Sequence, residues 1–243
     1  MGGRGGASRR SGGGGAKPKY TAKQKKTLAD TAKSLGIELS WDKLESNGVR
    51  YERIMRAFDI IRGMYSEYPG TEGLVQRITY EDKPNVYAAM DAMGTMYLGI
   101  WGTNPEVDVN MRYRSDLLSR FHPQGTVADD VIRHEMGHAM HFFITDQSGS
   151  FSGYDATTVN IVLAAAKRVN PDIKTIDDVY PLAEAISRYA VDKTSLKRHN
   201  STLKFATWET IAEAIGDYQA NREKANPLSV EINREVRRRL RKK

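Results

Sequence analysis

The chain of 243 residues is long enough for one substantial domain, and it has no cysteine, which excludes disulfides, thiolate metal ligands and a cysteine nucleophile. No apolar run approaches the roughly 20 residues of a membrane span, and no apolar segment follows the basic N-terminus as in a secretory signal, so we expect a cytoplasmic protein without membrane contact. The net charge of +7 lies at the ends, because residues 1–26 and 234–243 together carry +14 and leave −7 for the rest.

The two ends differ in composition from the body of the chain. Residues 1–19 include eight glycines and almost no apolar side chain, so they predict a flexible arm that cannot offset its ordering entropy. Residues 20–233 predict a single domain, and residues 234–243 predict a basic tail. The basic ends could hold nucleic acid or an acidic partner electrostatically, or they could be disordered segments that only keep the protein soluble.

The first elements in chain order are two helices. Residues 20–36 have helical composition and end at Gly36, a common helix stop. Residues 48–68 place apolar side chains at three- and four-residue spacing, which indicates an amphipathic helix: Ile54, Phe58, Ile61 and Met64.

Three short segments rich in Val, Ile, Tyr and Thr follow, and they predict strands. They cover residues 73–82, 85–93 and 95–101. Met93-Gly94 lies between the last two and indicates a tight turn. We therefore expect a small antiparallel or mixed sheet that contains a hairpin.

The remainder of the chain predicts mainly helices. Residues 113–121 predict a short helix, and Thr126 is placed to cap the helix that follows it, with Asp129 and Asp130 in the first turn. Four more helices are expected over residues 156–169, 175–189, 207–221 and 228–241. The order of helices, small sheet, central helix and helical C-terminal half indicates an α+β fold.

The central helix contains three of the five histidines, in the stretch HEMGHAMH. Positions i and i+4 lie on one helix face, so His134 and His138 can direct two imidazoles at one metal ion. Glu135 lies one step round the helix, where a carboxylate can take a proton from a water at the metal.

The alternative is an amphipathic helix whose polar residues face water. Two rows of residues along the helix argue against this alternative. The first row shows that the histidines continue an apolar face, since it consists of Val127, Val131, His134 and His138. The second row is an apolar face beside it, formed by Ile132, Met136, Ala139 and Phe143. Buried imidazoles need partners, and a metal supplies them.

The other histidines are weaker candidates. His141 follows His138 by three residues on the same helix and would crowd one side of the ion, so we interpret it as a bystander. His122 and His199 are interpreted as loop or surface residues. Asp146 is a weak candidate on spacing.

A catalytic zinc usually keeps three protein ligands, and a carboxylate is the expected third one here. Residues 205–222 predict a helix with a buried face, on which Glu209, Glu213 and Asp217 repeat every four residues. Either Glu209 binds the metal and Glu213 orients a ligand histidine, or Glu213 binds and Asp217 orients. A solvated acidic face would be the alternative without a metal.

The HEMGH motif with the later segment Glu209-Thr-Ile-Ala-Glu213-Ala resembles gluzincin-type zinc metallopeptidases. The segment is similar to that of anthrax lethal factor, in which the first glutamate is the ligand and the second supports a histidine. Glu213-Ala-Ile-Gly-Asp217 is also similar to a thermolysin segment that favours the other register. The longer match implies one Zn²⁺ on His134, His138 and Glu209, with Glu213 behind them.

The same resemblance implies a zincin-like fold and an oxyanion-stabilising tyrosine before the glutamate helix, for which Tyr189 is the candidate. The gap from Tyr189 to Glu209 is much longer than in the lethal-factor pattern. In zincins the edge strand of the sheet binds an extended substrate, and residues 95–101 are our candidate for it. The stretch 121–141 further resembles zincin-like domains attached to phage minor head proteins.

These observations predict a zinc-dependent endopeptidase that acts on a protein or peptide substrate, with Glu135 as general base and Tyr189 as oxyanion donor. The alternative is a head-associated structural or DNA-binding protein of a phage or prophage, present in the virion, whose zincin-like domain is not catalytic. A toxin-like protease acting on one host protein is a further option.

Overall fold

The computed structural model describes residues 20–83, 86–145, 151–194, 196 and 203–242. The predicted arm over residues 1–19 lies outside them, as do Asp146 and His199.

The N-terminal helices confirm the sequence-based expectations. Helix α1 (Ala22–Leu35) begins with a capping box of Thr21 and Gln24, and it ends at Gly36, whose φ of 69° is left-handed. A short helix, α2 (Trp41–Ser46), leads to α3 (Tyr51–Glu67). The four apolar residues that predicted α3 are all buried in the core: Ile54, Phe58, Ile61 and Met64.

The sheet is mixed and has four strands in the described part of the chain. The strands are β1 (Glu38–Leu39), β2 (Arg77–Tyr80), β3 (Ala88–Met90) and β4 (Thr95–Leu98), in the order β1-β2-β4-β3. Strands β1, β2 and β4 run parallel, and β3 pairs antiparallel with β4. The hairpin at Gly94 (φ 77°) is confirmed. Strand β1 was not predicted, because two residues are too short to show an alternating pattern.

The predicted edge strand is wrong. Strand β4 lies between β2 and β3, and the chain beyond it turns into the short helix α4 (Ile100–Thr103), which contains Trp101. The edge strands are β1 and β3, and β3 is the one next to β4, because the hairpin folds back on the side of β4 away from β2.

Helix α5 (Glu106–Leu118) starts seven residues before the predicted helix, and a loop then leads to the central helix α6 (Asp130–Thr145). The predicted Thr126 cap is wrong, because the Thr126 hydroxyl bonds Pro123 O and the Tyr113 hydroxyl instead. At the start of this helix, the carboxylate of Asp130 accepts a hydrogen bond from Val127 N at 2.7 Å. Val127 and Phe143, each predicted on an apolar stripe, are exposed.

The C-terminal half consists of helices α7 (Phe151–Val169), α8 (Tyr180–Glu184), α9 (Thr207–Asn221) and α10 (Pro227–Leu240), with 3-10 turns at Asp177–Val179, Tyr189–Val191 and Arg222–Lys224. Helix α9 has the predicted bounds, whereas the predicted helix over 175–189 is broken into short pieces. The Ser187 hydroxyl accepts from Ala190 N at 2.9 Å, which satisfies the backbone where the helix would otherwise continue. None of the described helices is both long and apolar enough to cross a bilayer.

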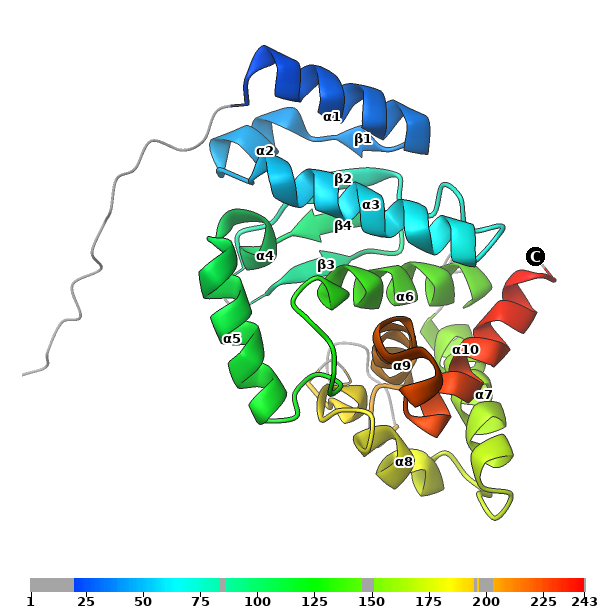
Figure 1. The fold of residues 1–243 in the computed structure, drawn as a ribbon. Coiled ribbons are helices and arrows are strands. Elements are labelled where there is room, and N and C mark those ends of the chain that lie inside the picture. Colours follow the sequence, from blue (N-terminus) through cyan, green and yellow to red (C-terminus); the bar gives the residue numbers. More distant parts are fainter. Residues whose placement is uncertain (1–19, 84–85, 146–150, 195, 197–202, 243) are drawn as a thin grey trace, which may run out of the picture.

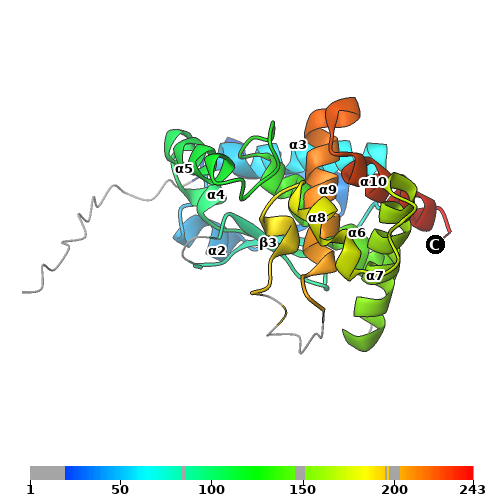
Figure 2. The same cartoon turned by 90° about the horizontal axis from the view of Figure 1, so that it is seen from below.

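Helix α6 is central to the arrangement (Figure 1). It lies beside β3 and α3 on one side, and it packs against α9 on the other. Helices α7 and α10 pack against α9 (Figure 2), and most residues of α6 and α9 are buried. The two helices that contain the candidate ligands therefore meet inside the domain.

Helix α10 confirms the predicted helix over residues 228–241, and it includes residues 234–240 of the predicted basic tail. Val236 and Leu240 are buried, and the arginines pair with buried or half-buried acids. Arg238 Nη2 and Arg239 Nε lie 2.6 and 2.8 Å from Glu235 Oε1. The apolar and basic residues of this segment thus form one amphipathic helix, and several of its arginines pair with acids of the same domain.

This arginine cluster predicts a loss of stability when Glu235 is neutralised. Burial alone would raise the pKa of Glu235, but the hydrogen bonds of Arg238 and Arg239 lower it from 4.5 to about 2. A lowered carboxylate pKa stabilises the fold above about pH 4.5, and that stability is lost as the pH falls through about 2. Because the arginines are partly solvated, we expect Glu235→Gln to cost about 2 kcal/mol at pH 7.

Urea unfolding at pH 7 and pH 3 checks this prediction. The difference in the free energy of unfolding between wild type and Glu235→Gln should be smaller at pH 3 than at pH 7. Glu223→Gln, at an exposed position, should have nearly the wild-type free energy of unfolding at either pH. An equal difference at both pH values would contradict the assigned role of the charge.

Candidate metal centre

Helix α6 brings the two predicted histidine ligands together. His134 and His138 are one helical turn apart, both are buried, and their Nε2 atoms lie 3.0 Å from each other. Glu209, in the first turn of α9, points its Oε2 atom at the pair, 3.5 Å from His134 Nε2 and 3.3 Å from His138 Nε2. These three residues form a group that could hold one metal ion.

The spacing of the three atoms fits a small tetrahedral cation. Ligand atoms about 2.0–2.1 Å from zinc in a tetrahedron lie roughly 3.3 Å from one another. The observed separations of 3.0, 3.3 and 3.5 Å are close to that value. Glu209 Oε2 is buried and has no well-formed hydrogen bond with the described residues, so a cation between it and the two imidazoles would satisfy it.

The pKa of Glu209 is compatible with a role as metal ligand. Burial would raise this pKa, but the positive potential of His138 and His134 holds it well below its usual range. The carboxyl group is therefore ionised at neutral pH, as a metal ligand must be.

Glu213 supports His134 from behind. Its Oε1 atom lies 2.8 Å from His134 Nδ1, the ring nitrogen on the opposite side from Glu209. The Ser187 hydroxyl donates to Glu213 Oε2 at 2.7 Å, and His122 Nδ1 lies 3.6 Å from Oε1. Burial opposes ionisation, yet the contacts to His122 and His134 lower the pKa of Glu213 to about 2.

The structure thus separates the two alternatives for the third ligand. Glu209 is in the ligand group and Glu213 is behind it, which is the register that we favoured. Asp217 is directed elsewhere, because it accepts from Asn221 Nδ2 at 2.7 Å and from Asn226 N at 2.9 Å. The contacts of Asp217 give no support to the register with Glu213 as ligand and Asp217 behind it.

His141 is not a bystander. It is fully buried, and its Nε2 atom lies 3.2 Å from His138 Nδ1. Because it approaches the ring nitrogen turned away from Glu209, it can orient His138 and fix its tautomer, although it cannot bind the same ion. The spacing argued against His141 as a ligand of the same ion. The same spacing could have predicted its contact with His138, because residues three apart lie on one face of a helix.

This contact predicts that His141 tunes metal affinity. We expect His141→Leu to weaken zinc binding about 10–100-fold, because His138 loses the partner that orients it. His141→Gln, which keeps a hydrogen-bonding group, should lose less. Competition with a chromogenic chelator measures the affinity, and thermal unfolding of the metal-free proteins controls for damage to the fold. Equal affinity in all three proteins would contradict the role.

His122 lies in a loop, as one part of its prediction stated, but it is not at the surface. Its ring is buried and stacks on Tyr113 at a centroid distance of 4.7 Å and an angle of 11°. The surrounding loop has the composition of an exposed turn, so its burial depends on α5 and was not visible in the local sequence.

Glu135 and Tyr189 flank the ligand group. Glu135 is buried beside the two histidines. Burial raises the pKa of its carboxyl group, although positive charge on His134 and His138 acts to lower it. The ring of Tyr189 lies 5.6 Å from that of His134. The charge of Glu209 and burial raise the pKa of Tyr189 well above its usual value, so the phenol keeps its proton and can donate a hydrogen bond.

The backbone holds Tyr189 in place. Tyr189 N donates to Phe121 O at 3.2 Å, and Arg188 N donates to Arg120 O at 2.7 Å. Arg120 adopts a left-handed φ of 57°, an uncommon conformation for a residue other than glycine. These bonds join the 3-10 turn to the loop before α6, across a long separation in sequence.

Gly137 allows α6 and α9 to approach closely. A Cβ atom at this position would lie 2.8 Å from Ala212 Cα, a distance that backbone atoms do not tolerate. The glycine between the two ligand histidines therefore brings the ligands of the two helices within reach of one ion.

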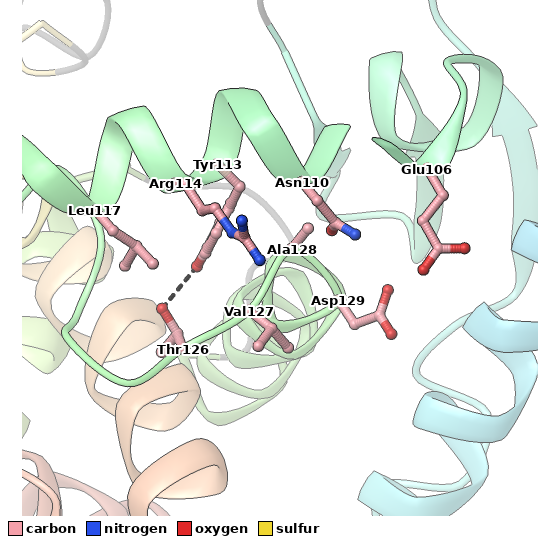
Figure 3. Close-up of a pocket in the computed structure, with 9 residues that line it drawn as sticks. All are labelled: Glu106, Asn110, Tyr113, Arg114, Leu117, Thr126, Val127, Ala128 and Asp129. Carbon is pink, nitrogen blue, oxygen red and sulfur yellow. Dashed lines mark hydrogen bonds between the residues drawn. The ribbon is translucent and has the colours of Figure 1, made fainter. Parts of the chain in front are cut away.

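A cavity of about 350 Å³ lies beside this region, between α5 and the loop that enters α6 (Figure 3). Tyr113 forms part of its wall and bonds the Thr126 hydroxyl at 2.8 Å. The same ring stacks on His122, so the wall of the cavity supports the residues behind the ligand group.

The sequence matches no protein-family model, and comparisons with curated proteins and with solved structures find no match. The chemistry of the centre is therefore argued from its own residues.

Proposed function

We propose that the protein is a zinc-dependent endopeptidase. The observation that carries this proposal is the buried group of His134, His138 and Glu209, with ligand spacing that fits a tetrahedral ion and with Glu135 beside it. Two imidazoles and one carboxylate suit zinc better than a hard cation such as magnesium, which prefers oxygen ligands.

Glu135 and Tyr189 have the properties that peptide hydrolysis needs. Bound zinc would supply a Lewis acid that polarises the peptide carbonyl and lowers the pKa of an attacking water. Glu135 takes a proton from that water as its oxygen attacks the carbonyl carbon, and it passes the proton to the amine as the C–N bond breaks. The protonated phenol of Tyr189 donates to the carbonyl oxygen as negative charge develops there.

Strand β3 is the proposed binding edge for the substrate. The residues on either side of β3 bond to β4 and its flanks: Gly99 N donates to Tyr87 O, and Asp91 N donates to Thr95 O. Because every second residue in an antiparallel pair turns its backbone groups toward the partner strand, Tyr87 and Asp91 face that side. Ala88 and Met90 turn theirs to the other side, where no strand pairs within the described part of the chain. An extended peptide can add there as a further strand.

The resemblance to gluzincins supports the proposal. The two histidines on one helix and the glutamate on a later helix occur in the order that the resemblance implies, and Glu213 lies behind His134 as that pattern expects. A mixed sheet with an antiparallel edge strand beside the histidine helix is consistent with a zincin-like fold.

Metal content and peptide cleavage test the proposal. We expect one zinc per chain in the wild type, cleavage of an unstructured protein substrate, loss of cleavage with a chelator and recovery on adding zinc. Glu209→Ala should weaken zinc binding by about 100-fold or more, whereas Glu223→Ala on the turn after α9 should not. A wild-type protein that binds no divalent metal under any loading condition would overturn the proposal.

A further inference from the structure

A second cavity lies next to the candidate metal centre. It has a volume of about 530 Å³ and is formed by the C-terminal half of α6, the β3–β4 hairpin turn and the loop before β2. Ala139, the residue after His138, is part of its wall, and so is Phe142, whose ring lies 6.3 Å from that of His138. The cavity therefore begins within about one helical turn of a candidate ligand.

The helix face that presents Glu135 leads into this cavity. Ala139 and Phe142 follow Glu135 by four and seven residues, so the three share one face of α6. Strand β3 leads to the same place, since the hairpin turn from Asp91 to Gly94 lines the cavity and directly follows the strand. A peptide on the edge of β3 would pass Glu135 and reach the cavity with one of its side chains.

Part of the cavity wall is apolar. Leu74, Met93, Phe142 and Phe143 form this part, and Met93 is 77% exposed in the absence of a bound chain. Large exposed side chains beside a cavity commonly mark a binding site.

The charged groups at the cavity are both acidic. Asp91 Oδ1 accepts from Met93 N and Thr95 N, and its Oδ2 accepts from the Tyr97 hydroxyl, so its carboxylate is held in place. Glu72 accepts from Gly70 N through Oε2. Among the described residues that line the cavity there is no Lys, Arg or His.

We infer that this cavity is a specificity pocket for an arginine or lysine side chain of the substrate. Such side chains have an apolar stem that can pack on the methionine and phenylalanine walls, and a cationic head that suits two carboxylates and an aromatic ring. The inference rests on the proposed peptidase function, because it assigns the pocket to a peptide bound on β3.

Peptide binding tests the pocket separately from catalysis. Fluorescent peptides that differ only in arginine against citrulline, or lysine against norleucine, are titrated against zinc-loaded Glu135→Gln, which should bind without cleaving. We expect the charged member of each pair to bind about five-fold more tightly. Glu72→Lys in the same background should remove this preference, whereas Glu223→Lys, an equal change of charge on the turn after α9, should keep it.

A positional scan of cleavage by wild-type protein completes the test, and a preference for a basic residue at one fixed position is expected. Cleavage without that preference, or an unchanged preference in Glu72→Lys, would overturn the pocket and leave the peptidase standing. A charge-dependent binding preference without any cleavage would support the pocket and overturn the peptidase. Neither cleavage nor a binding preference would overturn both.

Discussion

Glutamine in place of Glu135 is expected to lower the rate of peptide cleavage by about 10²–10⁴-fold without loss of zinc. The amide keeps the shape of the side chain but cannot take a proton from water. Since burial raises the pKa of Glu135, its ionised form costs folding free energy, and the uncharged amide should be at least as stable. The predicted change is thus a loss of rate without a loss of fold or metal.

Single-turnover cleavage, zinc content and thermal unfolding check this prediction together. Glu209→Gln is the matched control, because the same chemical change in the neighbouring acid should remove zinc as well as activity. Cleavage by Glu135→Gln at the wild-type rate would contradict the role of Glu135, and loss of its zinc would show that the residue acts on the metal instead.

Alanine at Gly137 is expected to disrupt the centre although it adds one methyl group. The new Cβ would lie 2.8 Å from Ala212 Cα, so α6 and α9 must move apart. Alanine favours a helix over glycine by about 1 kcal/mol, but the clash with backbone should exceed this gain and leave a net loss of about 1–2 kcal/mol. Because Glu209 is on α9, we also expect zinc affinity to fall about ten-fold or more.

Gly63 provides the control for helix propensity. It lies inside α3, and a Cβ atom there would meet nothing within 4 Å. Gly63→Ala should therefore stabilise the protein by about 0.5–1 kcal/mol with unchanged zinc affinity. Urea unfolding and chelator competition measure both effects, and a stabilised Gly137→Ala with normal affinity would contradict the close-approach argument.

The elements that the sequence predicted well are those with long amphipathic patterns. Helix α9 has its predicted bounds, and Trp208, Ile211 and Ile215 form its buried face. A helix fixes the relative directions of residues four apart, so the pairing of His134 with His138 and the shared face of Glu209, Glu213 and Asp217 were visible in the spacing, whereas the choice of Glu209 as the third ligand came from the resemblance to gluzincins. Local geometry alone determined the pairing and the shared face.

The features that were missed depend on contacts between distant segments. The parallel pairing of β2 with β4 follows from where the hairpin docks, and no pattern inside either strand encodes it. His122 is buried where its ring stacks on Tyr113 of α5. The helix that was predicted up to Tyr189 is interrupted at Ser187, whose hydroxyl donates to Glu213 of α9. In each case the deciding partner lies on another element.

The placement of the ligands on two helices links metal binding to folding. His134 and His138 are on α6, whereas Glu209 is on α9, about seventy residues later in the chain. An unfolded chain would have to close that loop before a third ligand could reach the ion, so the native state binds far more tightly than the denatured state. A cation in the centre would act as a removable cross-link whose contribution to stability grows with the logarithm of free metal concentration. Metal supply would then set what fraction of the molecules is folded, in addition to whether they are active.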